Sequence, residues 1–289
     1  MQKRTGGIAA FSKFSDGTLK LLNKQETQGV ACCHLTISPD ALYIYAVNYS
    51  SGNFAEFKLN EDGSIGERLQ VISHDKYPVG PRTDRQECAH THCSRFTPDG
   101  KFICIVDLGV DRILCYPYIP DHGISDNPVV NMTQPGDGPR HIIFTEDGNL
   151  AYVVNELGNS VTSYNYYSGK LTKIASFTTL PENFKDATKA AAIRFSPDKR
   201  FLYASNRGYD SIACYEITDK GILRLIDIVL SHGISPRDIN FLPSGKYFTA
   251  SNEFSDRICI FAFDEKNGTI RYMDGHDVTE QPRPLCIEY

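Results

Sequence analysis

A short turn motif recurs along the chain and keeps two other residue types at fixed distances from it. The motif reads Ser/Thr-Pro/Glu-Asp and begins at Ser38, Thr97, Thr145 and Ser196, with a looser copy at Leu242. Ten residues after each start comes an Asn or Asp: Asn48, Asp107, Asn155, Asn206 and Asn252. Nine residues further comes an aromatic: Phe57, Tyr116, Tyr164, Tyr215 and Phe261. Five copies with two constant spacings indicate a repeat protein with units of roughly 50 residues.

Each unit contains four strand-like runs and almost no helical periodicity. In the third unit the runs cover residues 141–144, 150–154, 161–164 and 171–177. Such alternating or apolar runs between turn residues predict strands, and four-strand units of this length are propeller blades. A β-sandwich is the alternative, but it gives no reason for equal four-strand units. We therefore expect an all-β fold, a β-propeller of four-stranded antiparallel blades, as a single domain over residues 1–289.

The same spacing shows how the two ends of the sequence fit the repeat. Residues 8–11 match a third strand with Phe11 as its aromatic, which places the Asn position at Gln2. Residues 282–289 match a first strand. A closing blade made from both ends would lack its second strand, so we expect about six blades and an N-terminally incomplete propeller.

Composition excludes several function classes. The formal net charge is −5 and there is no basic run, which argues against a nucleic-acid partner. No apolar stretch reaches the about 18 residues that span a bilayer, and residues 1–14 do not read as a secretory signal. Nine cysteines, several within apolar runs, indicate reduced buried thiols. We expect a cytoplasmic protein with no nucleic-acid or membrane partner.

Several polar residues that could take part in catalysis or binding lie at the open ends of the hairpins. In an antiparallel hairpin the start of the first strand lies beside the end of the second, so these positions should share one face of a propeller. The first-strand positions are Cys33, His92, Arg140, Ala191 and Arg237. The positions after the repeated Asn or Asp are Tyr49, Leu108, Glu156, Arg207 and Glu253. His34, His90 and His141 lie next to them.

This group of side chains suits an anionic substrate with a carbonyl that can be attacked. Arginine offers fixed charge and paired donors for phosphate or carboxylate, and a His or Glu can act as a general base on water. A structural interpretation stays open, because Arg237 could pair with Glu253 and Arg140 with Glu156. We expect the repeated Asn and Asp side chains to hydrogen-bond backbone in the loop after the second strand.

Other chemistries have weaker support. The segment Cys88-Ala-His90-Thr-His92-Cys93 holds four possible ligands for a soft metal. Alternation along a strand would send His90 and His92 to one side and Cys93 to the other, so we expect no metal site. The sequence has no nucleophile elbow, phosphate-binding loop or dinucleotide fingerprint, and nothing points to a Ser-His-Asp triad.

Five segments together resemble a known family. They are RQECAHTH (from Arg85), GDGPRHIIFTEDG, YVVNELGNSV, SPDKRFLYASNRGYDSI and GISPRDINFLPSGKY. In order and spacing they resemble the seven-bladed β-propeller lactonases, which include cycloisomerase-type 6-phosphogluconolactonases and fungal carboxymuconate cyclases. The resemblance covers essentially the whole chain, and relative to the family we expect about one N-terminal blade to be missing from this sequence.

The resemblance implies an active site and an activity. It implies catalytic roles for His92, Arg140, Glu156 and Arg207, with no metal and no other cofactor. Candidate substrate-binding residues are His90, His141, Arg82, Arg85, Arg237 and Glu253. The expected reaction is hydrolysis of 6-phosphoglucono-δ-lactone to 6-phosphogluconate, in the pentose phosphate pathway, by a monomer or weak homodimer. Two alternatives stay open: another carboxylated lactone of the carboxymuconate type, and a non-catalytic propeller that binds a partner.

Overall fold

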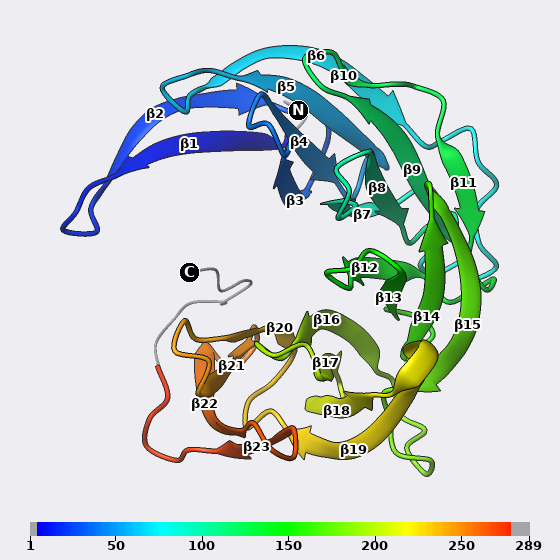
Figure 1. Cartoon of the computed structure of the whole chain (residues 1–289), viewed down its shortest axis with the longest axis vertical. Helices are drawn as coiled ribbons and strands as arrows, with labels where there is room; N and C mark the ends of the chain where they lie inside the picture. The colour runs from blue at the N-terminus through cyan, green and yellow to red at the C-terminus, as the bar shows by residue number, and fades with distance from the viewer. Residues whose placement is uncertain (1–4, 279–289) are drawn as a thin grey trace. The chain divides into compact units, whose positions relative to one another are not determined.

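The computed structural model describes residues 5–278 and is built almost wholly of antiparallel strands (Figure 1). Gln2 and residues 282–289, to which the sequence assigns strand positions, lie outside the described residues. The chain divides into two compact units. Unit 1 is Met1–Arg140 with Tyr167–Lys170, and unit 2 is His141–Tyr166 with Leu171–Tyr289. Among residues 5–278, no helix has the length and apolar character needed to cross a membrane.

Unit 1 contains a two-stranded sheet and two larger sheets. The two-stranded sheet pairs β1 (Gly7–Lys13) with β2 (Leu19–Glu26). The next has the order β3 (Cys32–Ile37), β4 (Tyr43–Asn48), β5 (Asn53–Leu59) and β6 (Ile65–Ser73). The third has the order β7 (Thr91–Phe96), β8 (Phe102–Asp107) and β9 (Arg112–Ile119), and β9 also pairs with β10 (Gly123–Ile124) and β11 (Val129–Met132).

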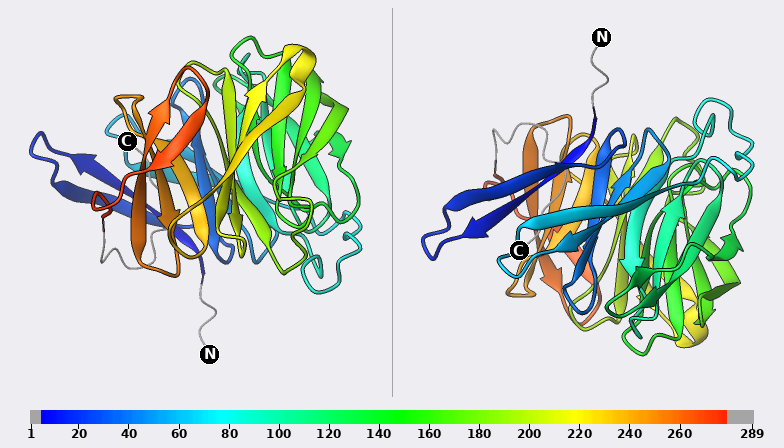
Figure 2. Two further views of the ribbon diagram at one scale, coloured as in Figure 1. Left: turned by 90° about the horizontal axis from the view of Figure 1, so that it is seen from below. Right: turned by 90° about the horizontal axis from the view of Figure 1, so that it is seen from above.

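Three further four-stranded sheets follow in chain order. The first is β12 (Pro139–Phe144), β13 (Leu150–Asn155), β14 (Ser160–Tyr167) and β15 (Lys170–Thr178), and the unit boundary falls within β12 after Arg140. The second is β16 (Lys189–Phe195), β17 (Phe201–Arg207), β18 (Ser211–Ile217) and β19 (Leu223–Leu230), with a 3₁₀ turn, η1 (Asp219–Gly221), before β19. The third is β20 (Pro236–Phe241), β21 (Tyr247–Asn252), β22 (Arg257–Asp264) and β23 (Thr269–Tyr272). In unit 2, Figure 2 shows the last two sheets side by side. These are the blades of a β-propeller, as the sequence predicts.

The repeated turn motif closes the hairpin between the first and second strands. Ser196 Oγ donates to Asp198 Oδ1 across 2.6 Å and accepts the backbone N–H of Phe201. Thr145 does the same with Asp147 and Leu150. The hydroxyl thus serves both sides of the turn, which explains why Ser or Thr opens the motif and Asp stands two residues later.

Apolar layers between neighbouring sheets form the cores. In unit 2, Tyr152 and Val154 of β13 pack in one cluster with Leu202 and Tyr215 of the next sheet. Each of these residues is at most 1% exposed. Second strands bury both faces because a sheet packs on each side, so they read as continuous apolar runs. In unit 1, Ile8 of β1 packs against residues of the sheet β3–β6, including Phe57.

Strand β1 fits the repeat as the third strand of a blade. The pairing of β1 with β2 shifts register between Ala10 and Phe11. The same irregularity occurs at Phe57 between β5 and β6, and at Tyr215 between β18 and β19. Phe11 therefore occupies the aromatic position of a third strand, as the spacing predicts.

The repeated Asn and Asp side chains are fully buried, but most do not bond the way the sequence suggested. Asp107 Oδ1 does accept the N–H groups of Gly109 and Val110 in the loop after its strand. Asn206 instead binds Thr179 at the end of the preceding sheet, with Oδ1 accepting from the hydroxyl and Nδ2 donating to the carbonyl. The prediction of a loop-backbone contact was too local, because this side chain links one blade to the next.

Candidate functional site at the ends of the inner hairpins

A β-bulge occurs at the first-strand position that the repeat singles out. Between β7 and β8 the register shifts across Thr91 and Cys93, so His92 is the extra residue. Between β20 and β21 the shift encloses Arg237, and between β3 and β4 it encloses Cys33. A bulge leaves one residue out of the ladder and re-aims its side chain. The same local device therefore sets the direction of these side chains in three blades.

Glu156 and Arg207 form a buried ion pair in unit 2. Glu156 directly follows β13, and Arg207 is the last residue of β17. Arg207 Nη2 lies 2.8 Å from Glu156 Oε2, and the two side chains are 13% and 4% exposed. The same Nη2 donates to the carbonyl of Ala190 at 3.1 Å, while the carbonyl of Glu156 accepts the N–H of Ala190. Ala190 of β16 therefore contacts both members of the pair, Glu156 through its N–H and Arg207 through its carbonyl.

The guanidinium of Arg207 keeps a donor available. Its buried Nε has no hydrogen-bond partner among residues 5–278. Unsatisfied buried donors are rare in folded proteins and call for an explanation. An arginine presents its donors as a rigid fork, and Nε is the donor of Arg207 that the described residues leave unsatisfied.

Arg237 and Glu253 form a second pair in unit 2. Arg237 Nη1 lies 3.2 Å from Glu253 Oε2, with the side chains 30% and 8% exposed. This is the within-blade pairing that the sequence left open as a structural role. Nearby, Arg194 of β16 pairs with Asp238 of β20 at 3.1 Å. Sequence reasoning missed that pair, because no repeat position marks Arg194 or Asp238.

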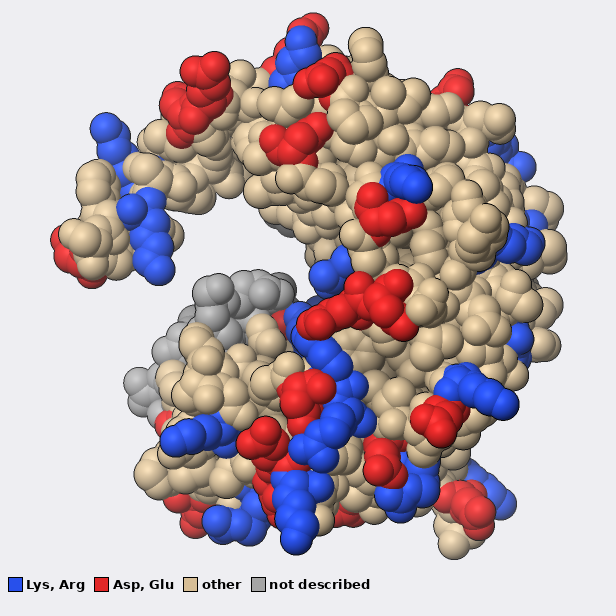
Figure 3. Space-filling model, viewed as in Figure 1, with Lys and Arg blue, Asp and Glu red and all other residues tan. Residues whose placement is uncertain are grey.

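Charged side chains of both signs lie close together on the face shown in Figure 3. Further pairs in unit 2 join Arg200 to Asp198 and Arg224 to Glu216. An anionic ligand bound to unit 2 would therefore contact arginines that already pair with carboxylates. Arg237, whose side chain is 30% exposed, is more accessible to such a ligand than a fully buried guanidinium.

In unit 1, His90, His92 and Arg85 meet at the Tyr49 side chain. The Tyr49 ring stacks on His90 with centroids 4.4 Å apart, and it meets His92 edge-on at 5.5 Å. Arg85 Nη2 donates to the Tyr49 hydroxyl at 3.1 Å. Both histidines are 4% exposed. Tyr49 follows Asn48 as Glu156 follows Asn155, but it was not among the predicted site residues. Its repeat position was the signal that could have included it.

The loop before Arg140 is held by a buried carboxylate of unit 1. Asp111 accepts the N–H groups of Gly136 at 2.7 Å and Gly138 at 2.9 Å. Arg82 Nε donates to the carbonyl of Gly136 at 2.9 Å. Arg140, at the start of β12, is 3% exposed. Arg82 thus supports this loop, and Asp111 is a supporting residue that the sequence did not reveal.

The structure brings the predicted residues together within each unit. Unit 1 contains the His90, His92 and Arg85 cluster around Tyr49, and separately Arg82 and Arg140. Unit 2 contains the Glu156 and Arg207 pair and the Arg237 and Glu253 pair. His141, the first residue of unit 2, is half-buried in β12. The placement of all these residues in one catalytic site stays a prediction.

The repeated four-stranded antiparallel sheets define the class of protein, a β-propeller. Within it, the sequence matches the family described as "Lactonase, 7-bladed beta-propeller" over residues 1–289. The chain belongs to this family, as the sequence motifs indicated.

Three relatives illustrate the similarity. An uncharacterized protein of Staphylococcus saprophyticus is 40% identical over 288 residues, which cover 98% of this chain and 81% of the relative. The structure of a "putative 6-phosphogluconolactonase" from Bacteroides fragilis matches with a TM-score of 0.89 and 33% identity, covering 97% of this chain and 79% of that one. The structure of the periplasmic gluconolactonase of Pseudomonas aeruginosa matches with a TM-score of 0.91 and 29% identity, covering 98% and 80%.

Proposed function

We propose that this protein is a lactonase that hydrolyses 6-phosphoglucono-δ-lactone to 6-phosphogluconate. The observation that carries the proposal is the buried pair of Glu156 with Arg207, 2.8 Å apart. It puts a carboxylate that can accept a proton beside a guanidinium that can stabilise a negative charge on the substrate. Family membership and the descriptions of the Bacteroides and Pseudomonas proteins support a sugar lactone as substrate.

Glu156 acts as the general base in this mechanism. It removes a proton from a water molecule whose oxygen attacks the lactone carbonyl carbon. The carbonyl π electrons move to oxygen, and the resulting oxyanion is stabilised by donors that are already in position. Collapse of the tetrahedral intermediate breaks the bond to the ring oxygen, which takes the proton back from Glu156. No metal or cofactor takes part in these steps.

Arg207 and Arg140 are proposed as the donors to the oxyanion. Arg207 offers Nε, which has no partner among the described residues. His92 is proposed to orient the attacking water or to serve as an alternative base. That His92 and Arg140 share the site with Glu156 and Arg207 rests on the sequence motifs, and the variants described in the Discussion test it.

The remaining predicted residues are proposed to bind the sugar and its phosphate. Arg82, Arg85 and Arg237 are candidates for the phosphate, because guanidinium groups bind phosphate oxygens with paired donors. His90, His141 and Glu253 are candidates for the sugar hydroxyls. The pentose phosphate pathway and a cytoplasmic location follow from this substrate as expectations only.

The deciding experiment compares three lactones in one assay, with spontaneous hydrolysis subtracted. The substrates are 6-phosphoglucono-δ-lactone, glucono-δ-lactone and a carboxymuconolactone. The proposal expects the highest kcat/KM for the phosphorylated lactone, at least about tenfold above glucono-δ-lactone, since a charge-assisted contact contributes about 1.5–3 kcal/mol. Equal rates on the two gluconolactones would remove the phosphate assignment but keep the lactonase. Preference for the carboxymuconolactone would select the alternative substrate. No turnover of any of them would favour a propeller that only binds a partner.

A further inference from the structure

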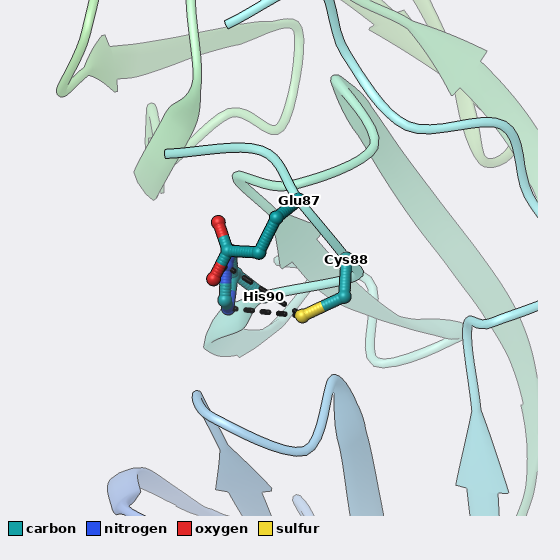
Figure 4. A group of neighbouring side chains, drawn as sticks. All are labelled: Glu87, Cys88 and His90. Atoms are coloured by element: carbon teal, nitrogen blue, oxygen red, sulfur yellow. Dashed lines mark hydrogen bonds and ion pairs between the residues drawn. The ribbon is translucent and has the colours of Figure 1, made fainter. Parts of the chain in front are cut away.

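Three metal-ligating side chains of different kinds lie together in the loop before β7. Glu87, Cys88 and His90 each offer one ligand atom, and these atoms all lie within 4.8 Å of one another. Figure 4 shows the Glu87 carboxylate and the Cys88 sulfur both beside the His90 ring. The mechanism proposed above does not use Glu87 or Cys88.

The two ring nitrogens of His90 each lie close to an acceptor oxygen. Nδ1 lies 3.0 Å from the backbone oxygen of Tyr49, which can only accept, so Nδ1 carries a hydrogen. Nε2 lies 3.1 Å from Glu87 Oε1, a second acceptor. A metal ion bound by Nε2 would also be attracted to this carboxylate. Histidine ligands of metals characteristically donate their other N–H to a backbone carbonyl in this way.

The spacings suit a tetrahedral zinc site. Zinc bonds of about 2.0–2.3 Å to nitrogen, oxygen and sulfur give ligand-to-ligand edges of roughly 3.3–3.6 Å. The observed separations from Nε2 are 3.1 Å to Glu87 Oε1 and 3.8 Å to Cys88 Sγ. Sγ is also 4.0 Å from Nδ1, so coordination needs a modest turn of the Cys88 side chain toward Nε2.

The loop that carries these ligands is anchored on both sides. Asp107 Oδ1 accepts the N–H of His90 at 2.8 Å, and the buried Gln86 donates from Nε2 to the carbonyl of Leu108 at 2.8 Å. Gly109 packs so closely on the backbone of Cys88 that a side chain there would collide with it. Positions fixed by such supporting contacts favour metal binding, because the ligands need little reorganisation.

The charges of the ligands are complementary to a divalent cation. Glu87 supplies a carboxylate, Cys88 a sulfur and His90 an imidazole nitrogen. A bound cation replaces the thiol proton, as it does for coordinating thiols generally.

We propose that Glu87, Cys88 and His90 form a binding site for a thiophilic divalent cation of the Zn²⁺ type. Sulfur and imidazole ligands select such ions over Mg²⁺ and Ca²⁺. Three protein ligands leave the fourth position open to water or to an oxygen of a bound ligand. The sequence argues against a metal site because strand alternation separates His90 and His92 from Cys93. The proposed site uses neither His92 nor Cys93, and it shares only His90 with the residues proposed to bind the substrate.

The test uses the metal-free full chain titrated with Zn²⁺ and, separately, with Co²⁺. We expect one equivalent of Zn²⁺ by calorimetry and elemental analysis, and a thiolate-to-cobalt charge-transfer band in the near ultraviolet. Cys88→Ser should abolish the band. Cys33→Ser, at an exposed cysteine, is the matched control and should keep it. Glu87→Gln changes a side chain that is 59% exposed, so the variant should fold like the parent. It should weaken Zn²⁺ binding at least about tenfold.

Three results would overturn the proposal. They are the absence of a cobalt-thiolate band in the folded protein, a band that persists in Cys88→Ser, and Zn²⁺ affinity unchanged in both Glu87→Gln and His90→Gln. Circular dichroism of each variant separates loss of the site from loss of the fold. Lactone hydrolysis is measured independently, so failure of either proposal leaves the other intact.

Discussion

Arg207 reaches from the end of β17 to the carboxylate of Glu156 after β13, joining two neighbouring sheets of unit 2 with a 2.8 Å contact. Both side chains are largely buried, at 13% and 4% exposed. Removing one partner of such a pair leaves a buried charge uncompensated. This relationship therefore serves the fold and, in the proposed mechanism, the chemistry.

Glu156→Gln should reduce kcat on the preferred lactone at least about a hundredfold, because the amide cannot accept the water proton. The matched control is Glu216→Gln, which also removes a carboxylate paired with an arginine, at a more exposed site. A folded Glu156→Gln protein with near-normal turnover would refute the role of this residue. Steady-state rates and thermal melting temperatures of both variants make the comparison.

Combining Glu156→Gln with Arg207→Lys should be non-additive, because residues in direct contact are energetically coupled. Lysine keeps the charge of Arg207 but lacks its fork of donors. We expect each single variant to lose most of the activity and the double variant to lose little more. Fully additive losses in kcat/KM would mean that the two side chains act independently.

Arg140→Ala should lower kcat at least about a hundredfold if this residue donates to the oxyanion. Asp111→Ala should lower kcat less, because it only frees the loop before Arg140, whose N–H groups Asp111 accepts. Asp111→Asn, which keeps one acceptor oxygen, should recover part of the loss. Equal kcat in all three variants and the parent would contradict the assignment of Arg140.

Tyr49→Ala should raise KM several-fold more than Tyr49→Phe. Phenylalanine keeps the ring that stacks on His90 and loses only the hydroxyl bound by Arg85. Aromatic pairs contribute about 0.5–1.5 kcal/mol beyond their buried area, so removal of the ring should loosen both histidines. If Phe and Ala at position 49 gave the same KM, the stack would have no part in substrate binding.

His74→Ala should destabilise unit 1 by about 2–5 kcal/mol, because it leaves a cavity and removes a hydrogen-bond partner of the buried Asp107. The side chains of His74 and Asp107 are completely buried, with Nδ1 2.8 Å from the carboxylate, and Nε2 contacts the Tyr116 hydroxyl at 3.1 Å. His122→Ala, at an exposed position, is the control. Denaturant unfolding together with hydrogen exchange of β8 measures the effect, and equal protection in the two variants would rule it out.

Asp147 should stabilise the protein at neutral pH and lose this contribution in acid. The Thr145 hydroxyl and the Asn149 N–H hold the pKa of this carboxyl below its usual range. A carboxyl with a lowered pKa in the folded state stabilises the protein above its unfolded pKa, and this stability is lost as pH falls through the folded pKa. Asp147→Ala should therefore lower the melting temperature at pH 7, and the difference should shrink below about pH 4. A difference that stays constant with pH would exclude this linkage.

Much of the blade architecture could be predicted because it depends on local signals. A Ser or Thr two residues before Asp specifies the hairpin turn through bonds within five residues, as at Ser196. Alternation with a period of two specifies strands, because successive side chains point to opposite faces. The constant spacing from turn to aromatic then identified Phe11 as part of a third strand.

What the sequence by itself determined is which residues lie at the hairpin ends, since strand length and turn position are local properties. Only the tertiary structure decided what they contact. Arg207 pairs with Glu156 of the preceding sheet, Arg237 stays within its own sheet, and Asn206 binds the end of the preceding blade. Cys88 lies beside His90 because their loop is anchored to Asp107 and Leu108, outside the alternation of a strand. Such contacts join segments far apart in the chain, so they depend on how whole sheets pack and leave no periodic trace in the sequence.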